Sequence, residues 1–133
     1  MMKRLLSTIL FVILALTTFA QTTSKTMNTD KLTNTTVRKA IDALQSADSK
    51  AWFALFTTDA ILHDDGNKMD FRSFFEKALG HDRFTSIDKV ENNGLDIYGH
   101  IHSDHWGDFK TYFKFRINSD GKIDRLDIGQ ASY

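Results

Sequence analysis

Residues 109–117, FKTYFKFRI, alternate apolar and polar side chains over their whole length. Successive side chains of a strand point to opposite faces, so one face of this segment is almost entirely apolar. The turn signal NSDG follows at residues 118–121, and residues 123–131 then predict a returning strand. This pattern indicates a hairpin whose apolar face needs a cover.

The same pattern continues upstream. Asn93-Gly94 is typical of a tight hairpin turn, and Leu95, Ile97 and Ile101 begin another alternating segment after it. Residues 84–91 precede that turn, but their apolar side chains recur every three residues, which predicts a strand with a bulge.

Helical spacing dominates the chain before Gly80. Residues 37–44 carry apolar side chains on one helical face, with Thr33, Asn34 or Thr35 as the cap. A second short helix is predicted after Asp48 or Ser49, with Trp52, Phe53, Leu55 and Phe56 in it. Residues 60–64 predict a short strand, and residues 71–79 a third helix capped by Asp70 and ended by Gly80. Helices that precede an antiparallel meander with one apolar face indicate an α+β domain.

The N-terminus has the layout of a secretory signal peptide. Met1–Arg4 is a short basic head, residues 5–16 are an apolar run of twelve, and Ala20 ends the segment. A spanning helix needs about 20 apolar residues, so we expect cleavage rather than stable membrane insertion. We therefore predict a signal peptide over 1–20, a disordered polar leader over 21–30, one domain over 31–133, and a periplasmic or secreted product.

Composition narrows the function classes. The chain has no cysteine, which excludes disulfides, thiolate chemistry and lipid attachment at the cleavage site. Removal of Lys3 and Arg4 leaves 15 basic against 17 acidic residues. No basic stripe is present to neutralise phosphates, so we expect no nucleic-acid partner.

The order of elements resembles that of the NTF2-like superfamily, on its SnoaL-like and ketosteroid-isomerase-like branch. The likeness is carried by AWFALFTTDAILHDDG (residues 51–66), FRSFFEKAL (71–79) and FKFRINSDGKIDRLDIGQ (113–130), and it spans about residues 33–132. The resemblance implies a cone-shaped, curved antiparallel sheet with three N-terminal helices packed on its concave face. It also implies a pocket between them, and members include isomerases, polyketide cyclases, dehydratases and transport factors, so the fold does not decide the function.

Asp64 is the candidate catalytic residue. Aligned without gaps, it falls where a ketosteroid isomerase carries its catalytic base, and a carboxylate in an apolar pocket is suited to proton transfer near neutral pH. Alternatively, Asp64 only caps the turn with Asp65 and Gly66. The same alignment places Ala40 and Phe113 where the isomerase has its oxyanion-binding groups, so we do not expect steroid isomerase activity. His63, beside Asp64, is a weaker candidate for a partner acid, because alternation places it on the opposite face.

The predicted pocket wall is largely aromatic, since the stripe of the third helix and the apolar face of the sheet have only each other to cover. We expect the ligand-binding residues to be Trp52, Phe56, Leu62, Phe71, Phe75, Phe113, Phe115 and Gln130. No cofactor is implied.

Three histidines, His100, His102 and His105, invite a metal-site interpretation. They lie near Lys114 and Arg116, which repel cations, so we predict solvated histidines or histidines in a subunit contact and no metal site. The face that carries Tyr98, His100, Tyr112 and Lys114 is predicted to form a homodimer, because aromatic residues amid charges often mark an interface.

Three functions remain open. The first is an exported pocket protein that binds a small apolar or partly polar ligand without turnover. The second is an isomerase, cyclase or dehydratase with Asp64 as general base, and the third is a non-catalytic dimeric interaction module. A pocket with an acid and a second polar group would favour the enzyme, and a purely aromatic pocket would favour binding.

Overall fold

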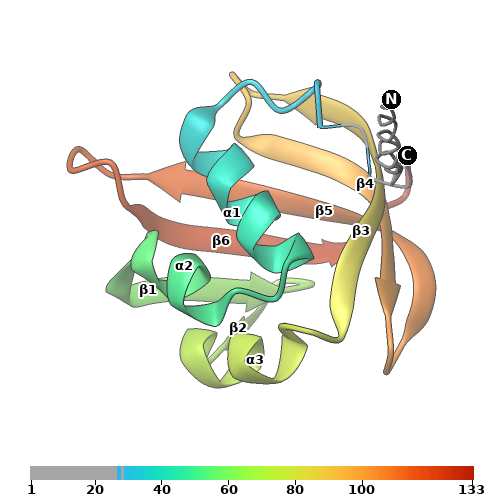
Figure 1. Cartoon of the computed structure of the whole chain (residues 1–133), viewed down its shortest axis with the longest axis horizontal. Helices are drawn as coiled ribbons and strands as arrows, with labels where there is room; N and C mark the ends of the chain where they lie inside the picture. Colours follow the sequence, from blue (N-terminus) through green and yellow to red (C-terminus); the bar gives the residue numbers. More distant parts are fainter. Residues whose placement is uncertain (1–26, 28) are drawn as a thin grey trace, which may run out of the picture.

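The computed structural model describes residue 27 and residues 29–133. The predicted signal peptide (1–20) and most of the predicted leader (21–30) therefore lie outside the described residues. The elements follow in the order α1 (Thr35–Gln45), α2 (Ser49–Ala54), β1 (Phe56–Asp64), β2 (Asn67–Met69), α3 (Phe71–Ala78), β3 (Asp82–Glu91), β4 (Asp96–Ser103), β5 (Gly107–Ile117) and β6 (Ile123–Gln130) (Figure 1). None of the described helices is long and apolar enough to cross a membrane.

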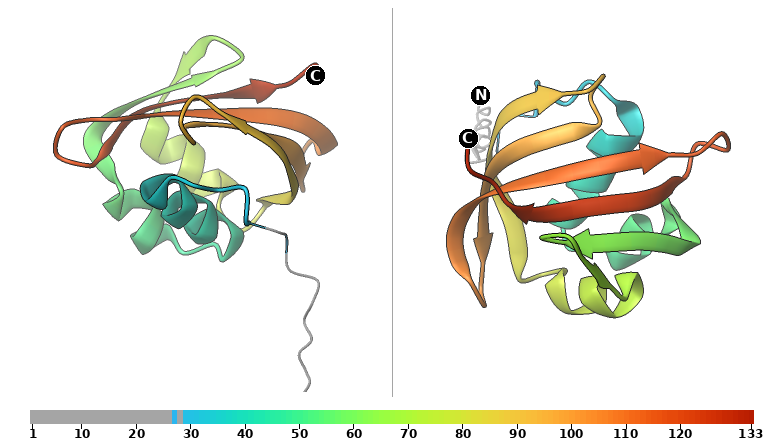
Figure 2. Two further views of the ribbon diagram at one scale, coloured as in Figure 1. Left: turned by 90° about the horizontal axis from the view of Figure 1, so that it is seen from above. Right: turned by 180° about the vertical axis from the view of Figure 1, so that it is seen from behind.

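The strands form one curved sheet in the order β2-β1-β6-β5-β4-β3. All three described helices lie on the concave side, and none of the described residues forms a helix on the opposite side of the sheet (Figure 2). The expected α+β class, with a curved sheet and helices on its concave face, is confirmed. One detail differs: β1 pairs with β6 in parallel, whereas the other pairs are antiparallel. A parallel pair needs a long crossover, and the whole chain from β2 to β5 supplies it.

Short polar side chains begin each helix. The side-chain oxygen of Asn34 accepts a hydrogen bond from Val37 N at 3.0 Å, and Asp48 and Asp70 cap α2 and α3 in the same way. These bonds satisfy N–H groups that the first helical turn leaves without a partner. Gly80, with a φ of +90°, follows α3 as the sequence predicted.

The predicted second helix is too long, because Phe56 begins β1 instead. The helix ends at Ala54, Leu55 is its C-cap, and the Leu55 carbonyl accepts a bond from Ile123 N at 2.9 Å. The apolar run around Phe56 thus spans a helix-to-strand junction, and β1 is longer than the predicted 60–64. The short strand β2 was missed, since all three of its residues are exposed and show no burial pattern. The bulge expected in residues 84–91 is present as two register shifts between β3 and β4.

The core lies between the helices and the concave face of the sheet. The ring of Trp52, which is fully buried, packs against Phe56 and Phe75 with centroids 4.8 and 4.6 Å apart. Phe113 is buried on the concave face, so the predicted register of β5 is correct.

Candidate functional site

A cavity of about 580 Å³ lies between α3 and the concave face of the sheet. Its apolar wall comes from two helices and three strands, namely from Leu44, Phe74, Phe75, Ile101, Phe109, Phe113 and Ile128. Its polar wall comes from Asp64, Asp65, Asp82, Asp108, Thr111 and Gln130, and Trp106 and Gly129 complete it. A concave, mostly apolar space with a few convergent polar groups is the usual form of a small-molecule site.

Four of the predicted site residues meet in this cavity: Asp64, Phe75, Phe113 and Gln130. The other predicted wall residues do not line it. Phe56 and Phe71 face a separate hollow of about 530 Å³ beside β2, and Trp52, Leu62 and Phe115 are buried core residues. The correction has a simple cause: ring-to-ring packing around Trp52 fills the space that these side chains were expected to leave open.

Asp64 ends β1 opposite Ile128 of β6 and faces the cavity. Burial raises the pKa of its carboxyl group above the ordinary value, and the neighbouring Asp65 carboxylate adds to the rise. Among the residues that the structure describes, none donates a hydrogen bond to the Asp64 carboxylate or forms an ion pair with it. Asp64 is thus a partly buried acid without a counter-charge.

The turn after β1 is closed by Asp65, which separates its role from that of Asp64. Asp65 has a φ of +49°, and its carboxylate accepts a hydrogen bond from Gln130 N at 3.0 Å. A Cβ at residue 129 would collide with this carboxylate and with the hydroxyl of Tyr112. Glycine at this position therefore lets both side chains lie close to the β6 backbone. The turn-capping role considered for Asp64 therefore belongs to Asp65.

His63 lies outside the cavity. Its Nδ1 is 3.4 Å from Asp127 Oδ1 on the neighbouring strand β6. Alternation along β1 accounts for this, because His63 and Asp64 point to opposite faces of the sheet.

Asp82, the first residue of β3, is a second cavity acid that the sequence reasoning missed. Its Oδ1 is buried and has no hydrogen-bond partner among the described residues. Burial raises the pKa of the Asp82 carboxyl group, while a hydrogen bond with the Ser103 side chain lowers it by a smaller amount. Residue 82 stands two positions before the inward-facing Phe84, and that spacing was the signal that could have placed it on the concave face.

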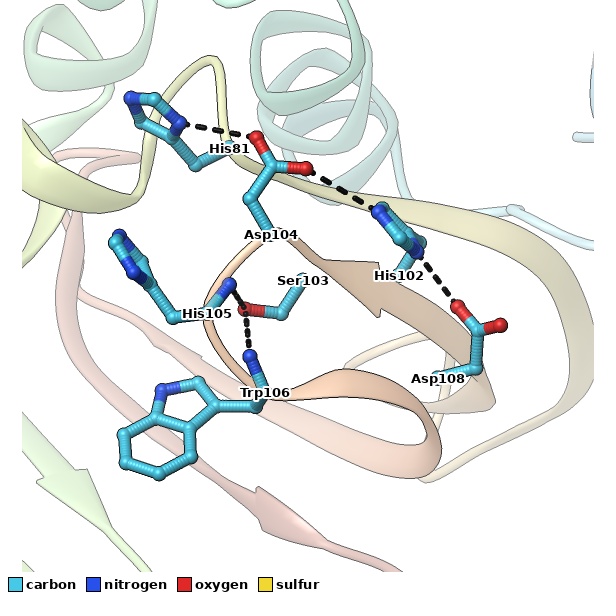
Figure 3. Close-up of polar contacts among 7 residues, drawn as sticks. All are labelled: His81, His102, Ser103, Asp104, His105, Trp106 and Asp108. Atoms are coloured by element: carbon cyan, nitrogen blue, oxygen red, sulfur yellow. Dashed lines mark hydrogen bonds and ion pairs between the residues drawn. The ribbon is translucent and has the colours of Figure 1, made fainter.

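The loop between β4 and β5 forms one side of the cavity mouth (Figure 3). Ser103 Oγ accepts hydrogen bonds from the backbone N–H groups of His105 and Trp106, each at 3.2 Å. Because that oxygen is already an acceptor twice, its proton is free to point at Asp82. The indole of Trp106 is 80% exposed and lines the cavity.

A chain of alternating histidines and aspartates supports this loop (Figure 3). Asp104 joins His81 Nδ1 at 3.0 Å to His102 Nε2 at 3.2 Å, and His102 Nδ1 lies 2.6 Å from Asp108 Oδ1. The hydrogen bonds to Asp108 and Asp104 raise the pKa of His102. The bonds to His81 and then His102 lower the pKa of Asp104.

The three histidines considered for a metal do not converge. His100 pairs with Asp88 at 2.8 Å on β3, His102 belongs to the chain at the mouth, and the ring of His105 lies 5.7 Å from that of His81. Within residue 27 and residues 29–133, no group of three or more histidines and acids is arranged to hold a metal ion.

The face predicted to form a dimer contains Tyr98, His100, Tyr112 and Lys114, on the side of the sheet away from the helices. Lys89 Nζ lies 4.6 Å from the ring centroid of Tyr98, and Lys114 Nζ lies 5.4 Å from that of Tyr112. These lysines lie over the tyrosine rings, so the face offers less bare aromatic surface than the sequence suggested.

Comparison with known proteins places this arrangement in a fold class. The chain matches no protein-family model and no curated protein sequence. Among solved structures it is similar to an NTF2-like protein of unknown function from Cytophaga hutchinsonii, with a TM-score of 0.59 and 14% identity over 72% of this chain and 87% of that one. It is also similar to a putative polyketide cyclase from Sinorhizobium meliloti, with a TM-score of 0.57 and 20% identity over 70% and 92%.

A third similar structure is the Orange Carotenoid Protein of Anabaena, which binds canthaxanthin. The TM-score is 0.64 and the identity 16%, over 83% of this chain but only 40% of that protein. These neighbours confirm the predicted resemblance as one of fold: the chain has the NTF2-like fold. At these identities the likeness shows the fold alone, so the function must be argued from the cavity.

Proposed function

We propose that the protein is an exported, small-molecule-binding protein whose ligand occupies the cavity between α3 and the sheet. The observation that carries this proposal is the cavity itself, about 580 Å³ with apolar side chains and several carboxyl groups in its wall. That volume is in the range of small-molecule sites. A similar fold that holds a carotenoid is consistent with an apolar ligand.

Export is the second part of the proposal and is supported by the basic head and the apolar run of residues 1–20. Intact-mass measurement of the protein from the producing cell's periplasm or medium should give a chain that lacks residues 1–20. Recovery of the full-length chain in the membrane fraction would contradict export.

Co-purification tests the binding function. The protein is purified without detergent, and native mass spectrometry followed by organic extraction identifies any bound small molecule. Gln130→Trp is the matched variant, because Gln130 is exposed at the cavity wall and its side chain makes no bond that holds the fold. We expect a bound molecule in the wild type and its loss in a folded Gln130→Trp protein. An empty wild type that also fails to bind a neutral apolar dye would overturn the proposal.

An enzyme is the second candidate, and the two cavity acids favour it. A carboxyl group with a raised pKa, such as that of Asp64, is suited to act as a general base near neutral pH. Asp82 has a raised pKa as well and supplies a second polar group, the feature expected of an enzyme pocket. Against this, Ala40 and Phe113 carry no hydrogen-bond donor, and the Thr111 hydroxyl already donates to the Gly129 carbonyl at 2.7 Å. Turnover of an identified ligand that disappears in Asp64→Asn would move the assignment from binding to catalysis.

A homodimer through the Tyr98 and Tyr112 face is a further proposal. Aromatic rings flanked by lysines and by acids such as Asp88 can pair with a second copy of the same face. Sedimentation equilibrium at micromolar concentration should give a dimer that dissociates in Tyr112→Glu. A monomer at every concentration would contradict it.

A further inference from the structure

The wall of the cavity carries several carboxyl groups, and none of the described residues that line it is basic. The carboxyl groups belong to four aspartates. Two of the four are already engaged, because Asp65 accepts a bond from Gln130 N and Asp108 pairs with His102. Asp64 and Asp82 are left facing the cavity.

Asp64 has no cation beside it among the described residues, whereas His105 and His81 lie close enough to Asp82 to attract its charge. Asp64 has neither a hydrogen bond nor an ion pair with any described residue, and one oxygen of Asp82 is buried without a partner. Removing a carboxylate from water is costly unless a counter-charge or a donor replaces the lost solvent. At Asp64, therefore, none of the described residues supplies a positive group to balance the carboxylate.

The rest of the wall suits the apolar body of a cationic molecule. Phe74 and Phe109 line the cavity, and Trp106 stands at its mouth with most of its indole uncovered. Aromatic faces attract organic cations as well as apolar groups. A shallower hollow shares Phe74, Asp82 and Trp106 with the cavity and adds Met69, so the apolar surface continues outward. Lys77 and His105 border only this outer hollow.

We infer that the cavity selects an organic cation: an amine with an aromatic or aliphatic body, its ammonium group directed to Asp64, while Asp82 adds negative charge to the same cavity wall. The inference rests on the proposed binding function and adds the charge of the ligand to it. An ammonium group supplies the charge-assisted hydrogen bond that the Asp64 carboxylate lacks, and an anionic ligand of the same shape is repelled by both carboxylates.

Three probes of similar shape test whether the ligand must be positively charged: 4-phenylbutylamine, 4-phenylbutanol and 4-phenylbutyrate. Each is titrated into the mature protein at neutral pH, and its affinity is measured by calorimetry. We expect the amine to bind about tenfold or more tightly than the alcohol, and the carboxylate to bind more weakly than either. The alcohol reports the apolar cavity without a charge. An alcohol that binds as tightly as the amine would overturn the cationic ligand and leave the binding function standing, whereas no binding of any probe would overturn both.

Matched variants locate the effect. Asp64→Asn and Asp82→Asn keep the shape of the side chain and remove its charge, so each should reduce the preference for amine over alcohol severalfold. Asp120→Asn makes the same change in net charge at the exposed turn between β5 and β6 and should leave the preference unchanged. An equal loss in all three variants would mean that only the net charge of the protein acts, and the assignment to Asp64 and Asp82 would be wrong.

Discussion

Two regions on the concave side of the sheet each contain a tryptophan, but one region is buried and the other is open. In the aromatic cluster, made of Trp52, Phe56, Phe71 and Phe75, ring centroids lie 4.5 to 5.4 Å apart and the side chains are buried. At the cavity rim, made of Asp64, Asp82, Asp108, Gln130 and Trp106, the wall is open and acidic. Phe75 belongs to the first region and also lines the cavity, so the two regions meet at its ring.

The difference lies in what each aromatic side chain can pack against. Trp52 projects from α2 into the space between α3 and the sheet, where rings surround it on two sides. Trp106 projects from a loop in which Ser103 Oγ accepts hydrogen bonds from backbone N–H groups and Asp104 bonds to His81 and His102 (Figure 3), and the indole of Trp106 stays 80% exposed. Polar groups at the rim therefore keep the cavity from collapsing into the aromatic cluster.

The largest expected effect compares the two tryptophans directly. Trp52→Ala should lower the free energy of unfolding by about 3–5 kcal/mol, because it removes a fully buried ring and leaves a cavity among packed rings. Trp106→Ala should change it by less than about 0.5 kcal/mol, since that indole is 80% exposed. Urea unfolding followed by circular dichroism measures both. Equal losses in the two variants would abolish the distinction between cluster and rim.

Asp64 gives a smaller effect that depends on pH. Its folded-state pKa is raised, so the folded protein holds the proton at a pH where the unfolded chain has released it. Wild-type stability should therefore fall as the pH rises from below 3.8, the ordinary pKa of an aspartate, through the raised pKa of the folded state. Asp64→Asn should lack this loss. At neutral pH the variant should be the more stable one, by less than about 1 kcal/mol because solvent screens a partly exposed carboxylate.

Urea unfolding at a series of pH values measures this difference, and NMR titration of the Asp64 carboxyl group gives the pKa directly. If Asp64 ionised at or below the ordinary pKa of an aspartate, its carboxyl group would not be a buried acid with a raised pKa. The residue-level case for catalysis would fall with it, because Asp64 is the group proposed as general base.

The sequence predicted the two regions unequally, for physical reasons. Periodicity located the buried face of each helix and strand, so the α+β class and the inward direction of Phe113 followed from it. Residue type indicated Asp70 as the cap of α3 and left two or three candidates for the caps of the other two helices. Ring packing is a matter of three-dimensional distance, and alternation alone did not show that Trp52, Leu62 and Phe115 fill the core rather than line the cavity.

Two of the rim residues, Asp64 and Gln130, were predicted from the sequence. The resemblance pointed to Asp64, but nothing comparable pointed to Asp82, which lies just before the residues expected to form a strand. The pairing of His102 with Asp104 and Asp108 joins a strand to the loop that follows it, and a loop conformation is not encoded in hydrophobic periodicity. The pairing of charged loop residues at the cavity mouth could therefore not be predicted from the sequence pattern.

The smallest expected effect concerns the histidine chain at the rim. His102 has a raised pKa because Asp108 and Asp104 hydrogen-bond to its ring, an effect that Arg83 opposes. A raised folded pKa means that protonated His102 stabilises the fold below its unfolded value of 6.5, and that this stabilisation is lost as the pH climbs through the folded value. In His102→Gln the melting temperature should lack that fall.

His105→Gln is the matched control, because His105 lies in the same loop but forms no ion pair with an aspartate among the described residues. Thermal melts of wild type and both variants, taken from below pH 6.5 upward, should show the pH-dependent fall in wild type and in His105→Gln only. Because His102 is exposed to solvent, the difference should also shrink as salt is added. If His102→Gln kept the wild-type pH dependence, the chain of histidines and aspartates would not act as a charged support. The open rim would then owe its shape to uncharged hydrogen bonds, such as those from His105 N and Trp106 N to Ser103 Oγ and from Asp104 N to the His81 carbonyl.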